Sequence, residues 1–289
     1  MTGRVAGIRD YVLSMLPKSL PRSRKTSALL SVGLVAVVGT AIIVPAVESG
    51  PAPLAGSGYA GSLVLNATGS ELESWNQTPS YCRGEFWEAP DGSVFVGSSG
   101  DAVLQTTGKP GSCVALISPG SYSSAVIEAD VYLPPLPGNG GMIADWTSLW
   151  LHGQDWPADG ELDAVEAAPA TGASAVTWHW GTAAAPLSVS TSAGAPDGTL
   201  PVDGPDITPG WHVVDIVYTR GFFAVYYDGK EYTSLSSSVV TGSPLEMLIT
   251  TSVTPDESGV NEVTGGPPVN SDRSAADVEV KYVRVWSFK

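Results

Sequence analysis

The sequence predicts an all-β fold for most of the chain, an antiparallel β-sandwich of two sheets. Short runs that alternate apolar and polar residues recur along it, as in residues 125–132 (AVIEADVY), and clusters of Gly, Pro, Asn and Asp separate them. Gly and Pro account for 33 and 23 of the 289 residues, which leaves little room for long helices. Strands without crossover helices between them pair in antiparallel fashion.

The N-terminal segment predicts membrane insertion or export. Residues 1–27 hold six basic residues and one acid, and residues 28–47 form a run of twenty residues without a charge. This order places the N-terminus in the cytoplasm and the rest of the chain outside. The run is either a cleaved signal peptide, with small residues at Val44-Pro45-Ala46, or an uncleaved membrane anchor. A buried core helix is the third alternative.

Residues 48–58 (ESGPAPLAGSG) have the composition of a linker, and residues 59–289 are expected to form one domain. Beyond residue 27 the chain holds 8 basic and 28 acidic residues, a net charge of −20. Because this charge repels phosphates, no nucleic-acid partner is expected. The domain is expected to be extracellular or at the cell surface, with the membrane as a partner only through an uncleaved N-terminal segment.

Eleven strands are expected in this domain. The pair Asp228-Gly229 follows one of them and indicates a hairpin turn, and no period of 20 to 50 residues repeats. One domain therefore fits best. The expected strands cover residues 61–66, 93–97, 102–106, 123–132, 146–151, 160–167, 175–180, 211–218, 222–227, 246–251 and 278–288.

The chain has two cysteines, Cys82 and Cys113, and both follow the export segment. An oxidising compartment permits them to pair, so a disulfide is the leading interpretation and a nucleophilic thiol the lesser one. Closing a loop of about thirty residues would stabilise the fold by ~3 to 4 kcal/mol without itself performing chemistry.

Three carboxylates lie within six residues of one expected strand: Glu161, Asp163 and Glu166. Side chains of a strand alternate between faces, so Glu161 and Asp163 share a face and Glu166 points the other way. A β-bulge between them would bring Glu166 back to the shared face, and bulges are common beside active sites. Either all three acids line one groove, where repulsion makes them costly unless they are used, or Glu166 is a solvated charge on the outer face.

Tryptophans surround this acidic strand in the sequence. Flat aromatic faces beside carboxylates suit a sugar ring, which needs both stacking and acid–base chemistry. A single tryptophan usually belongs to a core, but five within 35 residues are not all expected there. They are Trp146, Trp150, Trp156, Trp178 and Trp180.

At these residues the sequence resembles glycoside hydrolase family 16. Residues 161–166 (ELDAVE) match its bulged E-x-D-x-x-E motif, and residues 156–160 (WPADG) match the W-P-x-x-G lead-in of its laminarinase-like branch. Similarity to the family extends over residues 60–289, through residues 118–134, 148–151, 211–215, 226–229 and 282–286. The resemblance implies a concanavalin A-like jelly roll.

The resemblance also implies roles for individual residues. Glu161 matches the nucleophile, Glu166 the general acid/base, and Asp163 the acid that orients and tunes its neighbours. Retaining hydrolysis by such a pair needs carboxyl groups about 5 to 5.5 Å apart. The residues expected to bind substrate, with a structural role as the alternative for His179, are Trp146, Trp150, Trp156, His179 and Trp180.

No metal or other cofactor is expected. The histidines His152, His179 and His212 lack the spacing of a zinc site. In the closing strand the resembled family often has an acid of a structural calcium site where this chain has Lys281, which disfavours calcium without excluding it. The chain has neither a phosphate-binding glycine loop nor a G-x-S-x-G elbow, so nucleotide and serine-hydrolase functions find no support.

The predicted function is that of an exported retaining endo-glycosidase whose partner is a β-linked polysaccharide, with β-1,3- or mixed-linkage β-glucan as the leading substrate. A non-catalytic carbohydrate-binding jelly roll and a transglycosylase with the same residues are the alternatives. The presence of all three acids favours an enzyme over a binding module. Substrate choice is expected to lie in the loops at residues 133–145, 182–209 and 254–273.

Overall fold

The computed structural model describes eight stretches of the chain, all of them within the unit Glu48–Lys289. The expected apolar segment, residues 28–47, and the expected linker lie outside the described residues. Where the structure is described, it contains no helix with the length and apolar character needed to span a bilayer. The described stretches are residues 61–75, 92–107, 112–136, 139–168, 173–192, 197–202, 207–253 and 277–288.

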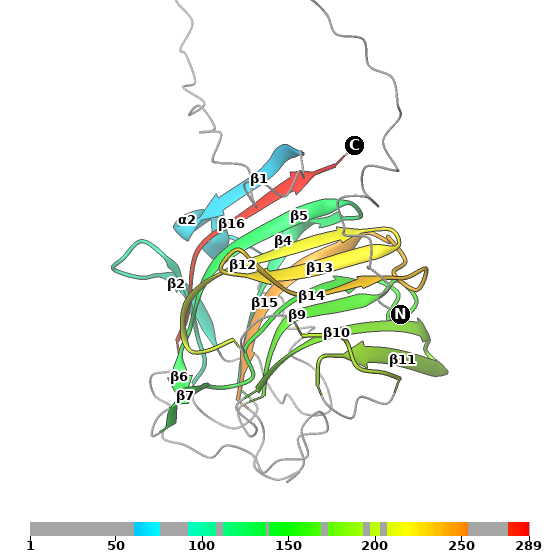
Figure 1. The fold of residues 1–289 in the computed structure, drawn as a ribbon. Helices are drawn as coiled ribbons and strands as arrows, with labels where there is room; N and C mark the ends of the chain where they lie inside the picture. Colours follow the sequence, from blue (N-terminus) through cyan, green and yellow to red (C-terminus); the bar gives the residue numbers. More distant parts are fainter. Residues whose placement is uncertain are drawn as a thin grey trace, which may run out of the picture. The chain divides into compact units, whose positions relative to one another are not determined.

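Two antiparallel sheets make up the domain (Figure 1). The first has eight strands, in the order β14-β13-β12-β5-β16-β3-β2, with β1 also paired to β16. Its strands are β1 (Ser62–Thr68), β2 (Ser93–Val96), β3 (Ala102–Gln105), β5 (Ala125–Leu133), β12 (Gly210–Thr219), β13 (Phe222–Tyr227), β14 (Lys230–Ser236) and β16 (Val278–Ser287).

The second sheet has six strands, in the order β11-β10-β9-β8-β15-β4. A two-stranded ribbon of β6 (Pro135–Leu136) and β7 (Asn139–Ile143) and one short helix, α2 (Gly69–Glu73), complete the described elements. The strands of the second sheet are β4 (Cys113–Tyr122), β8 (Ser148–Gly153), β9 (Glu161–Ala168), β10 (Ala173–Thr182), β11 (Ala185–Ser190) and β15 (Leu245–Ser252).

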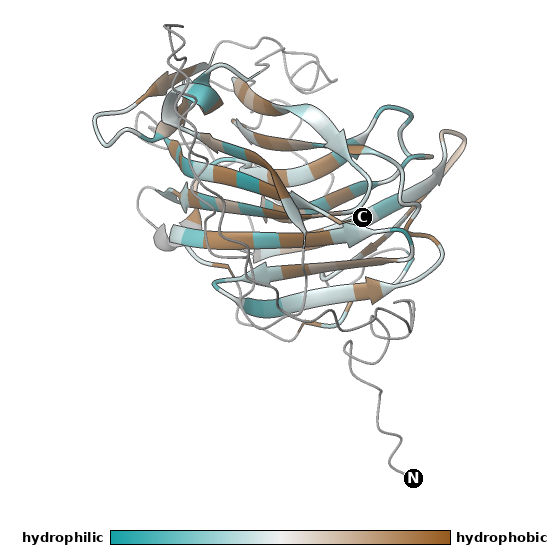
Figure 2. Cartoon of the chain, turned by 90° about the horizontal axis from the view of Figure 1, so that it is seen from above, coloured by the Kyte–Doolittle hydropathy of each residue, from teal (hydrophilic) through white to brown (hydrophobic). Residues whose placement is uncertain are grey.

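The hydrophobic core lies between the two sheets, because alternate side chains of each strand point inward. Hydrophilic and hydrophobic residues accordingly alternate along the strands (Figure 2). Trp178 of β10 is fully buried, and its ring centroid lies 6.2 Å from that of Tyr218 and 5.9 Å from that of Phe223, both from the opposite sheet. The Tyr227 hydroxyl, also from the opposite sheet, donates a hydrogen bond to the carbonyl of Ala164 in β9.

The predicted all-β antiparallel sandwich is confirmed, and each of the eleven expected strands is present, ten of them with shifted ends and β13 with the expected ones. Within the described residues β4, β6, β7, β11 and β14 were not expected as strands. β4 contains Pro119-Gly120, a pair typical of turns, and yet it continues to Tyr122. β11 and β14 lie at the edges of their sheets, and β14 has few apolar residues.

Cys113 begins β4 and is disulfide-bonded. Cys82, the other cysteine of the sequence, lies outside the described residues.

Candidate active site

A β-bulge in β9 brings three carboxylates to one face of the six-stranded sheet. The pairings of β9 with β8 and with β10 both shift by one residue between Asp163 and Glu166. The extra residue on β9 reverses the alternation of its side chains. Glu166 therefore joins Glu161 and Asp163 on the face turned away from the core, while Ala164 and Val165 are fully buried. The predicted bulge is confirmed.

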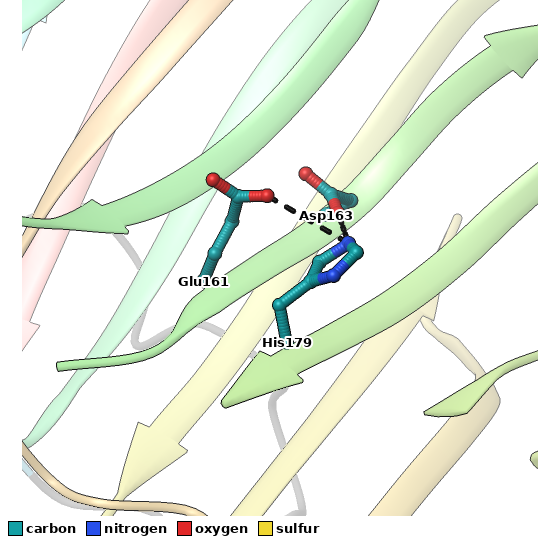
Figure 3. A group of neighbouring side chains, drawn as sticks. All are labelled: Glu161, Asp163 and His179. Atoms are coloured by element: carbon teal, nitrogen blue, oxygen red, sulfur yellow. Dashed lines mark ion pairs between the residues drawn. The ribbon is translucent and has the colours of Figure 1, made fainter. Parts of the chain in front are cut away.

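His179 of β10 contacts both Glu161 and Asp163 (Figure 3). Its Nε2 atom is 3.3 Å from Oδ2 of Asp163 and 3.7 Å from Oε1 of Glu161. The three side chains are 27%, 9% and 16% exposed, in the order His179, Asp163, Glu161. His179 thus contacts two of the three acids through one ring nitrogen.

The environment of Glu161 favours the protonated carboxyl group. Burial, followed by repulsion from Asp163, raises the pKa of Glu161 well above its usual range. A hydrogen bond from the Trp156 side chain acts in the opposite direction, because it stabilises the carboxylate. A nucleophilic Glu161 therefore depends on the donors that surround it.

Glu166 is protonated at neutral pH. Burial, followed by the charge of Asp163, raises its pKa to about 8, and Glu161 adds to this shift. His179 and a hydrogen bond from the Trp146 side chain lower the pKa without cancelling it. A carboxylic acid with a pKa near 8 is able to donate a proton at pH 7.

His179 carries more positive charge than an ordinary histidine. Burial by itself lowers its pKa, but the hydrogen bond with Asp163 and the charges of Asp163 and Glu166 outweigh burial, so the pKa is raised. The imidazolium form partly neutralises the acids around it. Asp163 therefore interacts with both glutamates and with the His179 imidazolium.

Trp146, Trp150 and Trp156 lie at the site, as expected. Trp146 and Trp156 hydrogen-bond to Glu166 and Glu161, respectively. Trp156 is also 40% exposed and lies 6.4 Å from His179, measured between ring centroids. Trp150 stands opposite Asp163 in the pairing of β8 with β9. The sequence suggests these tryptophans as stacking surfaces for a sugar ring. The structure shows in addition that Trp146 and Trp156 hydrogen-bond to the glutamates.

Trp180 lies on the opposite face of the sheet from the acids. It follows His179 directly in β10, so alternation turns its side chain toward the core, against which it packs half-buried. Trp178 points the same way and is fully buried. The structure does not bring Trp180 to the acids, contrary to the expectation that it contacts substrate there.

Two further residues share the face of the acids and were not recognised from the sequence. His152 of β8 lies directly opposite Glu161, and Glu246 of β15 lies directly opposite His152. The signal was present in the spacing, since His152 follows Trp150 by two residues and must face the same way.

A tightly hydrogen-bonded loop joins β8 to the acidic strand. The amide of Asp155 donates to the Asp159 carboxylate (3.0 Å), and the amide of Gly160 donates to the carbonyl of Pro157 (3.1 Å). Gly160 has a φ of +96°, and its Cα faces the Trp178 ring so closely that a Cβ would lie 2.3 Å from a ring carbon. Gly160 therefore allows the backbone to turn into β9 against the Trp178 ring, where a residue with a side chain would be strained.

Gly160→Ala is expected to destabilise the domain by about 2 to 5 kcal/mol, because it combines backbone strain with a clash against a buried ring. The free energy of unfolding from denaturant titration measures this. Gly229→Ala is the matched control, since Gly229 has a φ of +75° and open space around its Cα. That control should lose only about 1 kcal/mol. Equal losses in the two variants would show that contact with Trp178 is unimportant.

Two observations concern metal ions. Ligand atoms of Glu161, Asp163 and His179 lie within 4.8 Å of one another, close enough to gather around a cation. Lys281 places its Nζ atom 2.9 Å from Oδ2 of Asp130 and 4.2 Å from the centroid of the Trp211 ring.

No family model matches the chain. Among curated proteins, the chain is similar to the endo-1,3(4)-beta-glucanase xgeA of Emericella nidulans, with 27% identity over 104 residues. This match covers 36% of the chain and 16% of the length of that relative.

Solved structures share the fold. The catalytic domain of an endo-1,3-beta-glucanase (laminarinase) from Thermotoga petrophila RKU-1 is similar with a TM-score of 0.54 and 18% identity, over 80% of this chain and 99% of that one. A glycoside hydrolase family 16 protein of Bacteroides ovatus, solved with a mixed-linkage glucan product, gives a TM-score of 0.50 and 16% identity, over 76% and 93%.

The sandwich fold is one that this chain shares with solved glycoside hydrolases, and its three carboxylates lie on one face of a sheet. Among glycoside hydrolases, the resemblance is to glycoside hydrolase family 16 and its laminarinase-like members, as predicted from the E-x-D-x-x-E motif.

Proposed function

We propose that this chain is a retaining endo-β-glucanase that hydrolyses β-1,3- or mixed-linkage β-glucan. The observation that carries the proposal is the bulged strand, which puts Glu161, Asp163 and Glu166 on one face. One of these acids, Glu166, holds a proton at neutral pH with a pKa of about 8. Double displacement at a sugar carbon requires one carboxyl group that donates a proton and a second one that attacks as a carboxylate.

In the first step Glu161 attacks the anomeric carbon, and Glu166 donates its proton to the departing glycosidic oxygen. The product is a glycosyl ester on Glu161. In the second step Glu166, now ionised, removes a proton from water, and the resulting hydroxide displaces Glu161 from the anomeric carbon. Both residues return to their starting states, and the product retains its configuration.

The position of β9 supports cleavage within a chain. β9 has two sheet strands on one side and three on the other, in the order β11-β10-β9-β8-β15-β4. A glucan that crosses the strands therefore meets protein on both sides of the cleavage point: Thr177 and His179 of β10, and Trp150 and His152 of β8. Contacts on both sides favour an endo-acting enzyme.

The choice of β-glucan rests on the proteins that resemble this chain. The similar curated protein is named an endo-1,3(4)-beta-glucanase, and the similar structures are a laminarinase and a protein bound to a mixed-linkage glucan product. A transglycosylase would use the same acids with a sugar hydroxyl in place of water. A binding module would not need a glutamate that is protonated at pH 7.

The test is incubation of the full-length chain with laminarin, lichenan, agarose, carrageenan and xyloglucan. We expect a series of β-gluco-oligosaccharides early in the reaction, and ¹H NMR should show the β-anomer formed first. An α-anomer formed first would contradict the retaining mechanism. Binding without turnover on all five substrates would favour the carbohydrate-binding alternative, and products longer than the starting oligosaccharide would favour transglycosylation.

The proposal includes export of the domain, since residues 1–27 are basic and residues 28–47 carry no charge. Fractionation of cells that express the chain should recover the domain outside the cytoplasm, with Cys82 joined to Cys113 in mass spectra recorded without reductant. An N-terminus near residue 47 would indicate cleavage, and an intact chain in the membrane fraction would indicate an anchor. Recovery in the cytoplasm with free thiols would contradict export.

A further inference from the structure

A row of polar residues crosses the whole six-stranded sheet at the level of Glu161. Each member stands directly opposite the next in the strand pairings, so all of them point to the face of the acids. Glu161 lies within this row between two histidines. In sheet order the row consists of Ser188, His179, Glu161, His152, Glu246 and Ser121.

The two histidines approach different oxygens of the same carboxyl group. His179 Nε2 lies 3.7 Å from Oε1 of Glu161, and His152 Nε2 lies 3.8 Å from Oε2. Both distances are within ion-pair range and longer than a direct hydrogen bond. Such contacts commonly tighten when substrate excludes water. Glu161 is thus flanked on both sides, and a rotation of its carboxyl group would disturb both contacts.

The His152 ring is held on its other sides. Its centroid lies 5.4 Å from that of Trp150, with the rings nearly perpendicular at 81°. Trp150 is itself fixed, because its indole N–H donates to Oγ1 of Thr250 at 3.2 Å. Glu246 stands opposite His152 on β15. The side chain of His152 is 17% exposed, so one edge still faces the open side of the sheet.

The charges around His152 come from three elements. Burial, the largest effect, lowers the pKa of His152, while Glu246 on β15, Asp163 on β9 and Asp159 in the preceding loop raise it less. His152 is therefore neutral at pH 7, unlike the more basic His179. The two imidazoles differ in charge although they flank the same carboxyl group.

We propose that His152 is a positioning residue for Glu161, with Glu246 orienting the imidazole. The proposal rests on the proposed role of Glu161 as nucleophile. With an imidazole beside each oxygen, one oxygen stays directed at the anomeric carbon. A ring N–H that tightens to hydrogen-bond distance in the substrate complex would favour the ionised form that must attack. Fixing a reacting group in this way acts on the chemical step more than on substrate binding.

The test compares His152→Phe with His152→Gln in the full-length chain. His152→Phe keeps a ring against Trp150 and removes both nitrogens, so we expect kcat on laminarin or lichenan to fall about tenfold or more, with KM nearly unchanged. The acidic limb of the kcat/KM profile should move to higher pH, because Glu161 loses a stabilising donor. His152→Gln restores an N–H and should recover part of both effects. His212→Phe, in the other sheet, is the control and should leave the profile in place.

A second measurement does not depend on turnover. In ¹⁵N NMR titrations of the histidine side chains, Glu246→Gln should lower the pKa of His152, because Glu246 raises it in the wild-type chain. A normal kcat and an unshifted pH profile in folded His152→Phe would overturn the proposal. An unchanged pKa of His152 in Glu246→Gln would also overturn it. If the wild-type chain hydrolyses no glucan while Glu246→Gln still shifts the titration of His152, the proposed function fails and the coupling of these side chains stands.

Discussion

Glu161→Gln is expected to lower kcat/KM on β-glucan by on the order of 10⁴-fold or more, since the amide cannot form the glycosyl ester. The comparison is of initial rates for wild type and variant on laminarin and lichenan. Added azide should restore turnover to Glu161→Ala and give the inverted glycosyl azide, because the anion attacks in place of the missing carboxylate. Wild-type-like rates in Glu161→Gln would remove Glu161 from the reaction.

Loss of fold should not explain this result. The pKa of Glu161 is raised in the folded domain, so the folded state binds this proton more tightly than the unfolded chain does. The stability contributed by that proton is complete below the unfolded pKa and is lost as the pH rises through the folded value. A glutamine stays neutral throughout, and Glu161→Gln should therefore melt at or above the wild-type temperature at pH 7 to 8.

Glu166→Gln is expected to reduce hydrolysis of glucan by about 10² to 10⁴-fold, the usual contribution of a general acid. The loss should be far smaller on an aryl β-glucoside oligomer with a good leaving group, which departs without protonation. Wild-type kcat/KM should fall as the pH rises through about 8, where Glu166 loses its proton, and the variant should lack this basic limb on the aryl substrate. Rates as a function of pH on both substrates measure it.

Azide distinguishes the two glutamates. In Glu166→Ala the nucleophile remains, so azide intercepts the glycosyl ester and gives a product with retained configuration. An inverted product from Glu166→Ala would indicate that Glu166 is the nucleophile and Glu161 the general acid/base. An unchanged basic limb in Glu166→Gln would mean that another group titrates near pH 8.

Alternation of side chains was sufficient to predict the sandwich and its central strands. Residues 127–131 alternate apolar and acidic residues and lie within β5, which pairs with β12 and β16 in the larger sheet. Strands at the edges were harder to find, because one of their faces packs against little and their sequences stay polar. β14 (KEYTSLS) is such a strand, and its pairing with β13 became clear only from the structure.

The acids of the site were predictable because they are neighbours in one strand. Their partners were not, since a residue on β8 or β15 meets Glu161 only through the register of the pairing. His152 and Glu246 are 94 residues apart in sequence and adjacent in the sheet. Trp180 was grouped with the site because it follows His179 in the sequence. Adjacent side chains of a strand point to opposite faces, so Trp180 packs against the core instead.

The bulge in β9 also bears on how much length variation the strand could tolerate. A one-residue deletion in an ordinary strand turns every later side chain over to the other face. Glu161 and Glu166 are five positions apart, so in a regular strand their side chains would point to opposite faces. The extra residue of the bulge turns Glu166 to the face of Glu161. Deletion of Val165 would remove the bulge and leave a regular strand, in which the three carboxylates still point to the same face of the sheet. A one-residue deletion at this point is therefore compatible with an unchanged position of the proton donor.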